Sequence, residues 1–449
     1  MQELFYFKPD ELGIMFAVLV SIVFIAILIY TPVYMKHEEN RKRYYIFYFA
    51  VFFVLIAMSF SGSLITFYLF YELMTLCSVP LVMHEQTHEA VMGGLKYLFY
   101  SLAGAYPVLL GIFFLNKHAD SLRFAAGGIL NSVNGDDRKL MLVILFLMLM
   151  GFSVKAGMFP MHAWLTTAHP LAPAPASAVL SGIIVKAGVF GIIRTLFYVF
   201  GADFFTGTWV QTVLLILSLV TVFMGSALAY REEYFKKRLA YSTVSQISYI
   251  LFGLFITGGT SITGAMIHLF SHAFIKSSLF LIAGIFIIKT GYNKAADYAG
   301  IGKKMPVTLW CYTLCSLALI GIPPTGGFLS KWYLATGALA SGIPVFRYLG
   351  PVVLLISALL TAGYLLPVTM NGFFVAEDDS QGNSESRIPD PGTDGIGDKK
   401  DLRKEQLRKE PESSLLIPVI ILTVLSLIIG MFPGPLEDLI QRLASLWIS

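Results

Sequence analysis

The sequence predicts an all-α polytopic membrane protein with about twelve transmembrane helices. Of its 449 residues, 56% are hydrophobic and only 13% are charged, whereas a soluble globular protein carries about 25% charged residues. Apolar runs recur along the whole chain at about 20 residues, the length that spans about 30 Å of hydrocarbon. A membrane β-barrel would instead show short segments of alternating polarity. Bundled helices are therefore the expected architecture.

The expected spans follow one another closely. They cover 12–35, 45–61, 63–83, 92–115, 140–159, 177–198, 209–229, 239–257, 262–288, 306–337, 350–375 and 413–432. Two of them are interrupted, because 140–159 stops at Pro160 and the motif GIPPTGG breaks 306–337. Proline removes a backbone donor, and an open backbone at membrane depth needs protein or a water-lined cavity to satisfy it. In transporters such breaks often mark the ion path.

The distribution of basic residues predicts the orientation. With the N-terminus outside, nineteen Lys and Arg fall in inside loops and seven fall in outside segments. The positive-inside rule therefore favours an outside N-terminus and, with an even number of spans, an outside C-terminus. The polar segment 376–412 would be an inside linker, because its composition cannot bury a core.

Charged groups occur where the membrane makes them costly. They are Glu72, Lys155, Lys186, Lys276 and Lys331. One such group at the centre of a span costs about 2.5–3.5 kcal/mol, so five together cost about 10 kcal/mol or more. That is comparable to the stability of a whole domain, about 5–15 kcal/mol. Each has a structural alternative, an ion pair or a lysine at a helix end, but as a set they predict functional groups facing a wet interior.

The stretch MIHLFSHAFIKSSLFLIAG places three titratable groups on one helix face. His268, His272 and Lys276 follow one another at four-residue intervals, so they stack along a helix. Histidine exchanges protons near neutral pH, and a desolvated lysine can reach the same range. We expect a proton relay. The alternatives are core histidines with satisfied partners or a shared metal, which the lack of Asp or Glu nearby disfavours.

No cofactor site is recognisable in the sequence. There is no Cys cluster for an iron–sulfur centre, no GxGxxG with an acidic partner and no P-loop. Cys77, Cys311 and Cys315 lie in apolar runs and are interpreted as small buried thiols. We therefore expect no cofactor and no metal in this chain, and a driving reaction that belongs to partner subunits.

Five segments, in this order, resemble a known family. They are YELMTLCSVPLV, FSVKAGMFPMHAWLTTAHPLAPAPASAVLSGIIVKAGVFGIIR, KKRLAYSTVSQISYI, IHLFSHAFIKSSLFLIAG and IPPTGGFLSKWYL. Together they resemble the antiporter-like subunits shared by respiratory complex I, Mrp-type sodium/proton antiporters and energy-converting membrane-bound hydrogenase complexes. The resemblance covers roughly residues 45–375.

The resemblance implies two inverted five-helix repeats, each with a broken helix. They would be 45–198 and 209–375, preceded by a transmembrane helix and basic loop at 1–44. The inside linker at 376–412 and a final helix and tail at 413–449 would follow. Family members usually have fourteen spans, and this numbering starts at what looks like the third, so two N-terminal helices are expected to be absent. That leaves open the contacts those helices make with neighbours.

The resemblance also implies roles for single residues. Glu72 looks like the fifth-helix Glu that pairs with the seventh-helix Lys, here Lys155, and Lys186 looks like the central eighth-helix Lys. His268, His272 and Lys276 match the histidine-bearing eleventh helix. Lys331 matches the ionisable group of the second broken helix.

The function implied is proton translocation by one subunit of a redox-driven complex in a prokaryotic inner membrane. Partners would be further antiporter-like subunits and iron–sulfur redox subunits, with no nucleic acid. An Mrp-type antiporter subunit is the alternative, with sodium as the other candidate ion. A scaffold that moves no ions is a third hypothesis, and a free-standing solute transporter is a weaker fourth.

Overall fold

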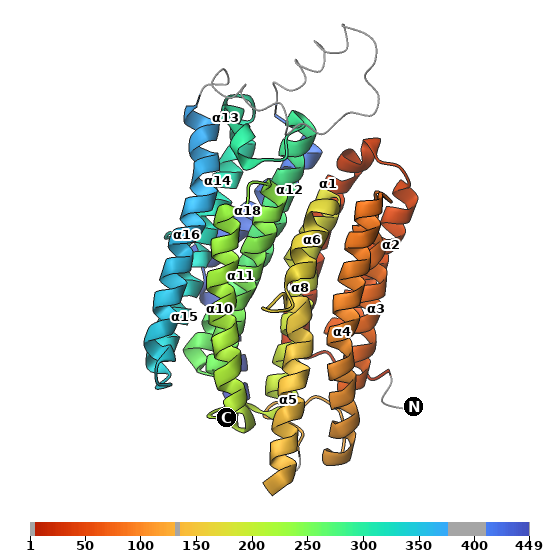
Figure 1. Ribbon diagram of the computed structural model, residues 1–449, viewed down its shortest axis with the longest axis vertical. Helices are drawn as coiled ribbons and strands as arrows, with labels where there is room; N and C mark the ends of the chain where they lie inside the picture. The colour runs from red at the N-terminus through yellow and green to blue at the C-terminus, as the bar shows by residue number, and fades with distance from the viewer. Residues whose placement is uncertain (1–4, 131–134, 376–409, 449) are drawn as a thin grey trace, which may run out of the picture.

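The computed structural model describes residues 5–130, 135–375 and 410–448 (Figure 1). Within these ranges the chain is helical, and its extended pairings are only the isolated bridges Phe7–Ser61, Ser63–Arg123 and Tyr234–Lys294. The long helices lie side by side along the long axis of the molecule (Figure 1). The predicted all-α fold is confirmed. Residues 376–409, which make up most of the inside linker expected at 376–412, lie outside the described residues.

Eleven helices in the described ranges are long and apolar enough to cross a membrane. They are α1 (Glu11–Tyr34), α2 (Arg41–Ser59), α3 (Leu64–Val82), α4 (His88–His118), α5 (Gly135–Ala156), the continuous segment Ala174–Phe200, α10 (Trp209–Arg231), α11 (Phe235–Ile256), α12 (Gly259–Thr290), α16 (Phe346–Phe374) and α18 (Ser413–Met431). The segment Ala174–Phe200 consists of α7 (Ala174–Val179), η2 (Leu180–Ile184), α8 (Val185–Ile193) and η3 (Arg194–Phe200). The remaining expected span, 306–337, is the pair α14 (Pro306–Ile320) and α15 (Gly326–Ala340).

Shorter helices lie in the connections and at the end of the chain. They are η1 (Met35–His37), α6 (Ala163–Leu171), α9 (Ala202–Phe205), η4 (Ala295–Tyr298), α13 (Ile301–Lys304) and α19 (Gly434–Ile448). The last, α19, falls in the expected C-terminal tail. It buries Ile440, Leu443, Ala444 and Trp447, and the Trp447 ring stacks on Phe197 with centroids 4.8 Å apart.

Both predicted interruptions are present. The first separates α5 from the half-helix α6, and the chain leaves α5 through Gly157 at φ +77°, a conformation that glycine adopts without strain. The second separates α14 from α15, where Gly321 ends α14 at φ +95°. Each break leaves the last carbonyl groups of a helix without helical partners, so side chains can use them as acceptors.

The centre of the bundle is formed by the helices that carry most of the predicted charges. In its most apolar 18-residue stretch, Ala174–Phe200 is 100% buried, α11 is 94% buried and α12 is 89% buried. The corresponding values are 39% for α2 and 33% for α16, whose outer faces expose apolar side chains. In Figure 1, α2–α4 flank the central helices on one side and α14–α16 on the other. Charges on α8 and α12 therefore cannot reach lipid or bulk water directly.

Candidate functional site

The structure places the seven predicted residues on five helices. Glu72 is on α3, Lys155 on α5, Lys186 on α8, the group His268, His272 and Lys276 on α12, and Lys331 on α15. The first broken helix contributes Lys155, which lies one residue before the end of α5. Five of the seven are at most 2% exposed, namely Lys155, Lys186, His268, His272 and Lys276. Glu72 and Lys331 are half-buried.

Lys155 is held by hydroxyl groups and aromatic rings. Its Nζ donates to Thr75 Oγ1 at 2.5 Å and to Tyr97 Oη at 3.3 Å, and it lies 5.2 Å from the ring centroid of Tyr71. Glu72 is close enough for its charge to act on Lys155, and its buried Oε1 has no hydrogen-bond partner among the described residues. Among the described residues, Glu72 and Lys155 therefore interact through their charges but form no direct ion pair.

Lys186 follows a π-helical turn in the middle of its helix. Its Nζ donates to the carbonyl oxygen of Ser181, five residues earlier, at 2.6 Å. Such widened turns open the regular hydrogen-bond ladder and occur frequently at functional sites. The charge of Lys276 on α12 acts on Lys186, so these two buried lysines lie within electrostatic reach of each other.

Glycines allow the helices around Lys186 to approach closely. A Cβ at Gly182 would lie 2.1 Å from Ser277 Oγ on α12, and one at Gly188 would lie 2.7 Å from Phe152 O and from Ala156 N on α5. Small residues permit this close backbone contact between membrane helices. The result is that α8 and the turn before it pack directly against the helix of Lys155 on one side and the helix of Lys276 on the other.

The predicted stripe on α12 is confirmed as a buried row. Lys276 Nζ donates to the Leu239 carbonyl at 3.0 Å and to Ser242 Oγ, both on α11. His268 Nδ1 lies 2.8 Å from Ser330 Oγ, and its ring stacks on His272 with centroids 5.8 Å apart. Within the described residues, both ring nitrogens of His272 and Nε2 of His268 have no hydrogen-bond partner. Three buried ring nitrogens in this row therefore lack a protein partner in the described structure.

Lys331 uses the carbonyl groups that the second break leaves open. Its Nζ donates to the carbonyls of Leu319 and Ile320 at 2.7 and 2.9 Å, in the last turn of α14. Helix C-termini carry partial negative charge, which stabilises the ammonium group. The Nζ also lies 4.9 Å from the ring centroid of Tyr249, whose ring stacks on His268 at 5.6 Å. Lys331 is therefore joined to the histidine row through one tyrosine.

Sequence reasoning missed His169. This residue is fully buried in α6, its ring stacks on Phe280 at 4.7 Å, and neither ring nitrogen has a partner among the described residues. The charges of Lys276, Lys236 and Lys186 act on it. The surrounding motif TAHPLAPAPASA indicates only a loop or half-helix, and the histidine gives no signal because its neighbours lie on distant segments.

Electrostatic interactions connect most of these groups in one series. The charges of Lys186, Lys276, His268 and Lys331 all act on His272, while Glu72 and Lys155 act on each other. Chemically, the series can bind, hold and pass protons between nitrogen atoms. A metal site is a poorer interpretation, because in the ranges that the structure describes no group of three or more His, Cys, Asp or Glu side chains comes together.

Known proteins match most of the chain. A family model described as NADH:quinone oxidoreductase/Mrp antiporter, TM, matches residues 61–370, and one described as NADH-Ubiquinone oxidoreductase (complex I), chain 5 N-terminus, matches 4–45. The chain is 30% identical over 432 residues to NADH-quinone oxidoreductase subunit N of Desulforudis audaxviator, covering 96% of this chain and 82% of that protein. It is 25% identical over 427 residues to a Na(+)/H(+) antiporter subunit of Alkalihalophilus pseudofirmus, covering 95% and 80%.

Solved structures show the same fold. A chain in the Mrp complex from Dietzia sp. superimposes with a TM-score of 0.82 and 22% identity, covering 99% of this chain and 84% of that one. A chain in the archaeal membrane-bound sulfane sulfur reductase gives 0.80 and 20% identity, with 98% and 85% covered. With the family match over residues 61–370, these findings confirm the resemblance: the protein is an antiporter-like membrane subunit of the NADH:quinone oxidoreductase/Mrp antiporter family.

Proposed function

We propose that this chain moves protons across a membrane as one subunit of a redox-driven complex. The observation that carries the proposal is the buried series of lysines and histidines on α8, α12 and α15, linked by electrostatic interactions. Such groups are costly in a membrane, and an apolar residue would serve a scaffold equally well at each position. The 30% identity to NADH-quinone oxidoreductase subunit N over 96% of the chain supports the redox-driven assembly over other settings.

In this mechanism Glu72 controls the proton on Lys155. An opposite charge nearby favours the protonated form of a lysine, and its withdrawal favours release. Thr75, which holds the Lys155 ammonium group, lies three residues after Glu72, so both acceptors occupy one face of α3. A shift of the Lys155 side chain by about one turn along α3 would join it to Glu72 or separate it from Glu72.

The released proton moves through water to Lys186, and from there past Lys276, His272 and His268 to Lys331. The ring nitrogens of His272 and Nε2 of His268, which lack partners in the described part of the chain, are suited to this, because buried polar groups normally bind protein or water. Lys331 then exchanges its proton with one side of the membrane.

The proposal also includes the orientation of the chain in the membrane and its internal repeats. The N-terminus is outside, the membrane is the inner membrane of a prokaryote, and 45–198 and 209–375 act as two inverted repeats. Each contains one broken helix, α5–α6 or α14–α15. The driving reaction belongs to partner subunits, including iron–sulfur redox subunits and further antiporter-like chains.

The direct test replaces Lys186 by Ala in the assembled complex. We expect loss of ion pumping measured with a pH-sensitive dye in inverted membrane vesicles, while complex assembly on a native gel is retained. Pumping at the wild-type rate would contradict the proposal.

An Mrp-type antiporter is the second candidate, supported by the Na(+)/H(+) antiporter relative, which matches 95% of this chain. Purification of the complex in mild detergent and mass spectrometry of its subunits separates the two. Iron–sulfur subunits support the redox-driven complex, whereas only small membrane subunits and a second antiporter-like chain support the Mrp hypothesis.

A further inference from the structure

A charged cluster lies at the end of the bundle where α1 ends and α11 begins. Glu38 follows η1, Glu85 lies between α3 and α4, and Lys236 is the second residue of α11. Lys236 interacts electrostatically with both carboxylates, and these interact with each other. Glu85 is exposed and Glu38 is half-buried. Burial and the neighbouring carboxylate raise the pKa of Glu38, so its carboxyl binds a proton more readily than a free one.

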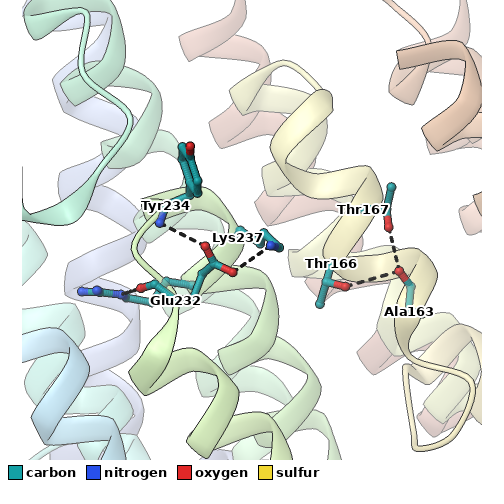
Figure 2. A network of polar contacts seen from close by, with 7 residues as sticks. Ala163, Thr166, Thr167, Glu232, Tyr234 and Lys237 are labelled. Carbon is teal, nitrogen blue, oxygen red and sulfur yellow. Dashed lines mark hydrogen bonds and ion pairs between the residues drawn. The ribbon is translucent and has the colours of Figure 1, made fainter. Parts of the chain in front are cut away.

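Lys236 is directed toward the first broken helix. Its Nζ donates to the carbonyl of Ala172 at 3.0 Å, the residue that follows α6. The adjacent Lys237 behaves differently, because its Nζ forms an ion pair with Glu232 at 2.8 Å, as Figure 2 shows. The side chains of these two consecutive lysines therefore point in different directions. Lys236 points toward the first broken helix, and Lys237 points toward the loop before α11.

His169 lies beyond Lys236. It is fully buried, and both ring nitrogens lack a partner within the described part of the chain. Its electrostatic partners are Lys236 near the surface and Lys186 and Lys276 in the interior. Ser177 Oγ donates to the carbonyls of both His169 and Ala172, which fixes the end of α6 between the two groups.

We propose that Glu38, Glu85, Lys236 and His169 form the mouth through which protons pass between water at this end of the bundle and the Lys186–Lys276 pair. The inference rests on the proposed function and adds the entry that the interior series lacks. Lys236 gives a proton from its ammonium group through water to a ring nitrogen of His169. A protonated carboxyl of Glu38 or Glu85 restores that proton, and the resulting carboxylate takes one from bulk water. Only protons move, so charge and atoms balance at each step.

The test compares neutral variants with matched neighbours in the assembled complex. The variants are E38Q/E85Q and K236Q, and the controls are E39Q and K237Q, which change the adjacent residue of the same type. Proton pumping in inverted vesicles should fall by about tenfold or more in the variants, since positioned acid–base groups typically contribute that much or more. The controls should pump at the wild-type rate, and E38D/E85D, which keeps both carboxyls, should restore most of the activity.

Three results would contradict the proposed proton entry. Wild-type pumping in E38Q/E85Q and K236Q, with Lys186→Ala inactive, would remove this proposal and leave the proposed function standing. An equal loss in the E39Q and K237Q controls would show a general effect of surface charge. If Lys186→Ala itself pumped normally, both proposals would fall. Should the double variant fail to assemble, the single variants E38Q and E85Q test the same point.

Discussion

The two ends of the ion series hold their lysines in different ways. Lys155 lies near a carboxylate, Glu72, and donates to the hydroxyls of Thr75 and Tyr97. Lys331 donates to two carbonyls at the end of α14, and no carboxylate is among its electrostatic partners in the described structure. In the proposed mechanism the charge of Glu72 controls the proton on Lys155 at the first end, whereas at the second end a break in the helix provides fixed dipoles. A charge can be removed by one substitution, but a helix break depends on backbone geometry.

The largest effect is expected at the second end. Lys331→Met keeps much of the length of the side chain but removes the ammonium group, so protons would have no terminal carrier. Ion pumping should fall by about 100-fold or more in vesicles that contain the assembled complex. The control is Lys303→Met, since Lys303 is an exposed lysine in α13. Retention of more than half of the wild-type rate by Lys331→Met would place the exit elsewhere.

A smaller effect is expected at the carboxylate end. Glu72→Gln removes the charge that acts on Lys155 but preserves size and hydrogen-bonding shape, so pumping should fall by about tenfold or more. Glu72→Asp keeps the charge and should recover much of the rate. If the Gln and Asp variants pump equally, then the charge of Glu72 does not control Lys155 and the comparison between the two ends fails.

The helix break itself can be tested by stability. A Cβ at Gly327 would lie 1.7 Å from the Ala318 carbonyl oxygen, which is backbone and cannot move aside cheaply. Gly327→Ala should therefore destabilise the fold by about 1–3 kcal/mol, measured as a lower midpoint of thermal unfolding in detergent. Gly434→Ala is the control, because nothing in the described structure lies within 4 Å of its Cβ position. An unchanged midpoint for Gly327→Ala would show that α14 and α15 are more loosely packed.

The smallest effects concern single hydroxyl partners. Ser242→Ala removes one acceptor from Lys276 and leaves the Leu239 carbonyl, while Thr75→Val leaves Tyr97 for Lys155. Each loss is worth about 1 kcal/mol, so pumping should change by about fivefold. Thr75→Val should leave Lys155 closer to Glu72, because it removes the hydroxyl that now holds the ammonium group. The expected result is a lower pumping rate with unchanged assembly of the complex. A rate equal to wild type for both variants would mean that carbonyls and rings alone hold these lysines.

Much of the site was predictable because its signals are local. Each of the seven predicted residues lies on a helix expected from the apolar pattern, and the stripe His268–His272–Lys276 is a buried row. Glu72 and Lys155 were expected to pair, and the structure gives Lys155 hydroxyl partners with an electrostatic link to Glu72. Lys236 and His169 carry no comparable signal in the sequence, since their significance depends on helices far away in the chain.

The sequence by itself determined the spans, the two breaks and the identity of the costly groups. Hydropathy over about 20 residues, proline, glycine and buried charge act within one segment, so they can be interpreted without knowing what lies beside it. The tertiary structure alone decided which acceptor each lysine uses and which cations face one another. Those contacts join residues such as Lys155 and Thr75 or Lys276 and Leu239, far apart in the chain, and they exist only once glycine-lined helices have packed closely.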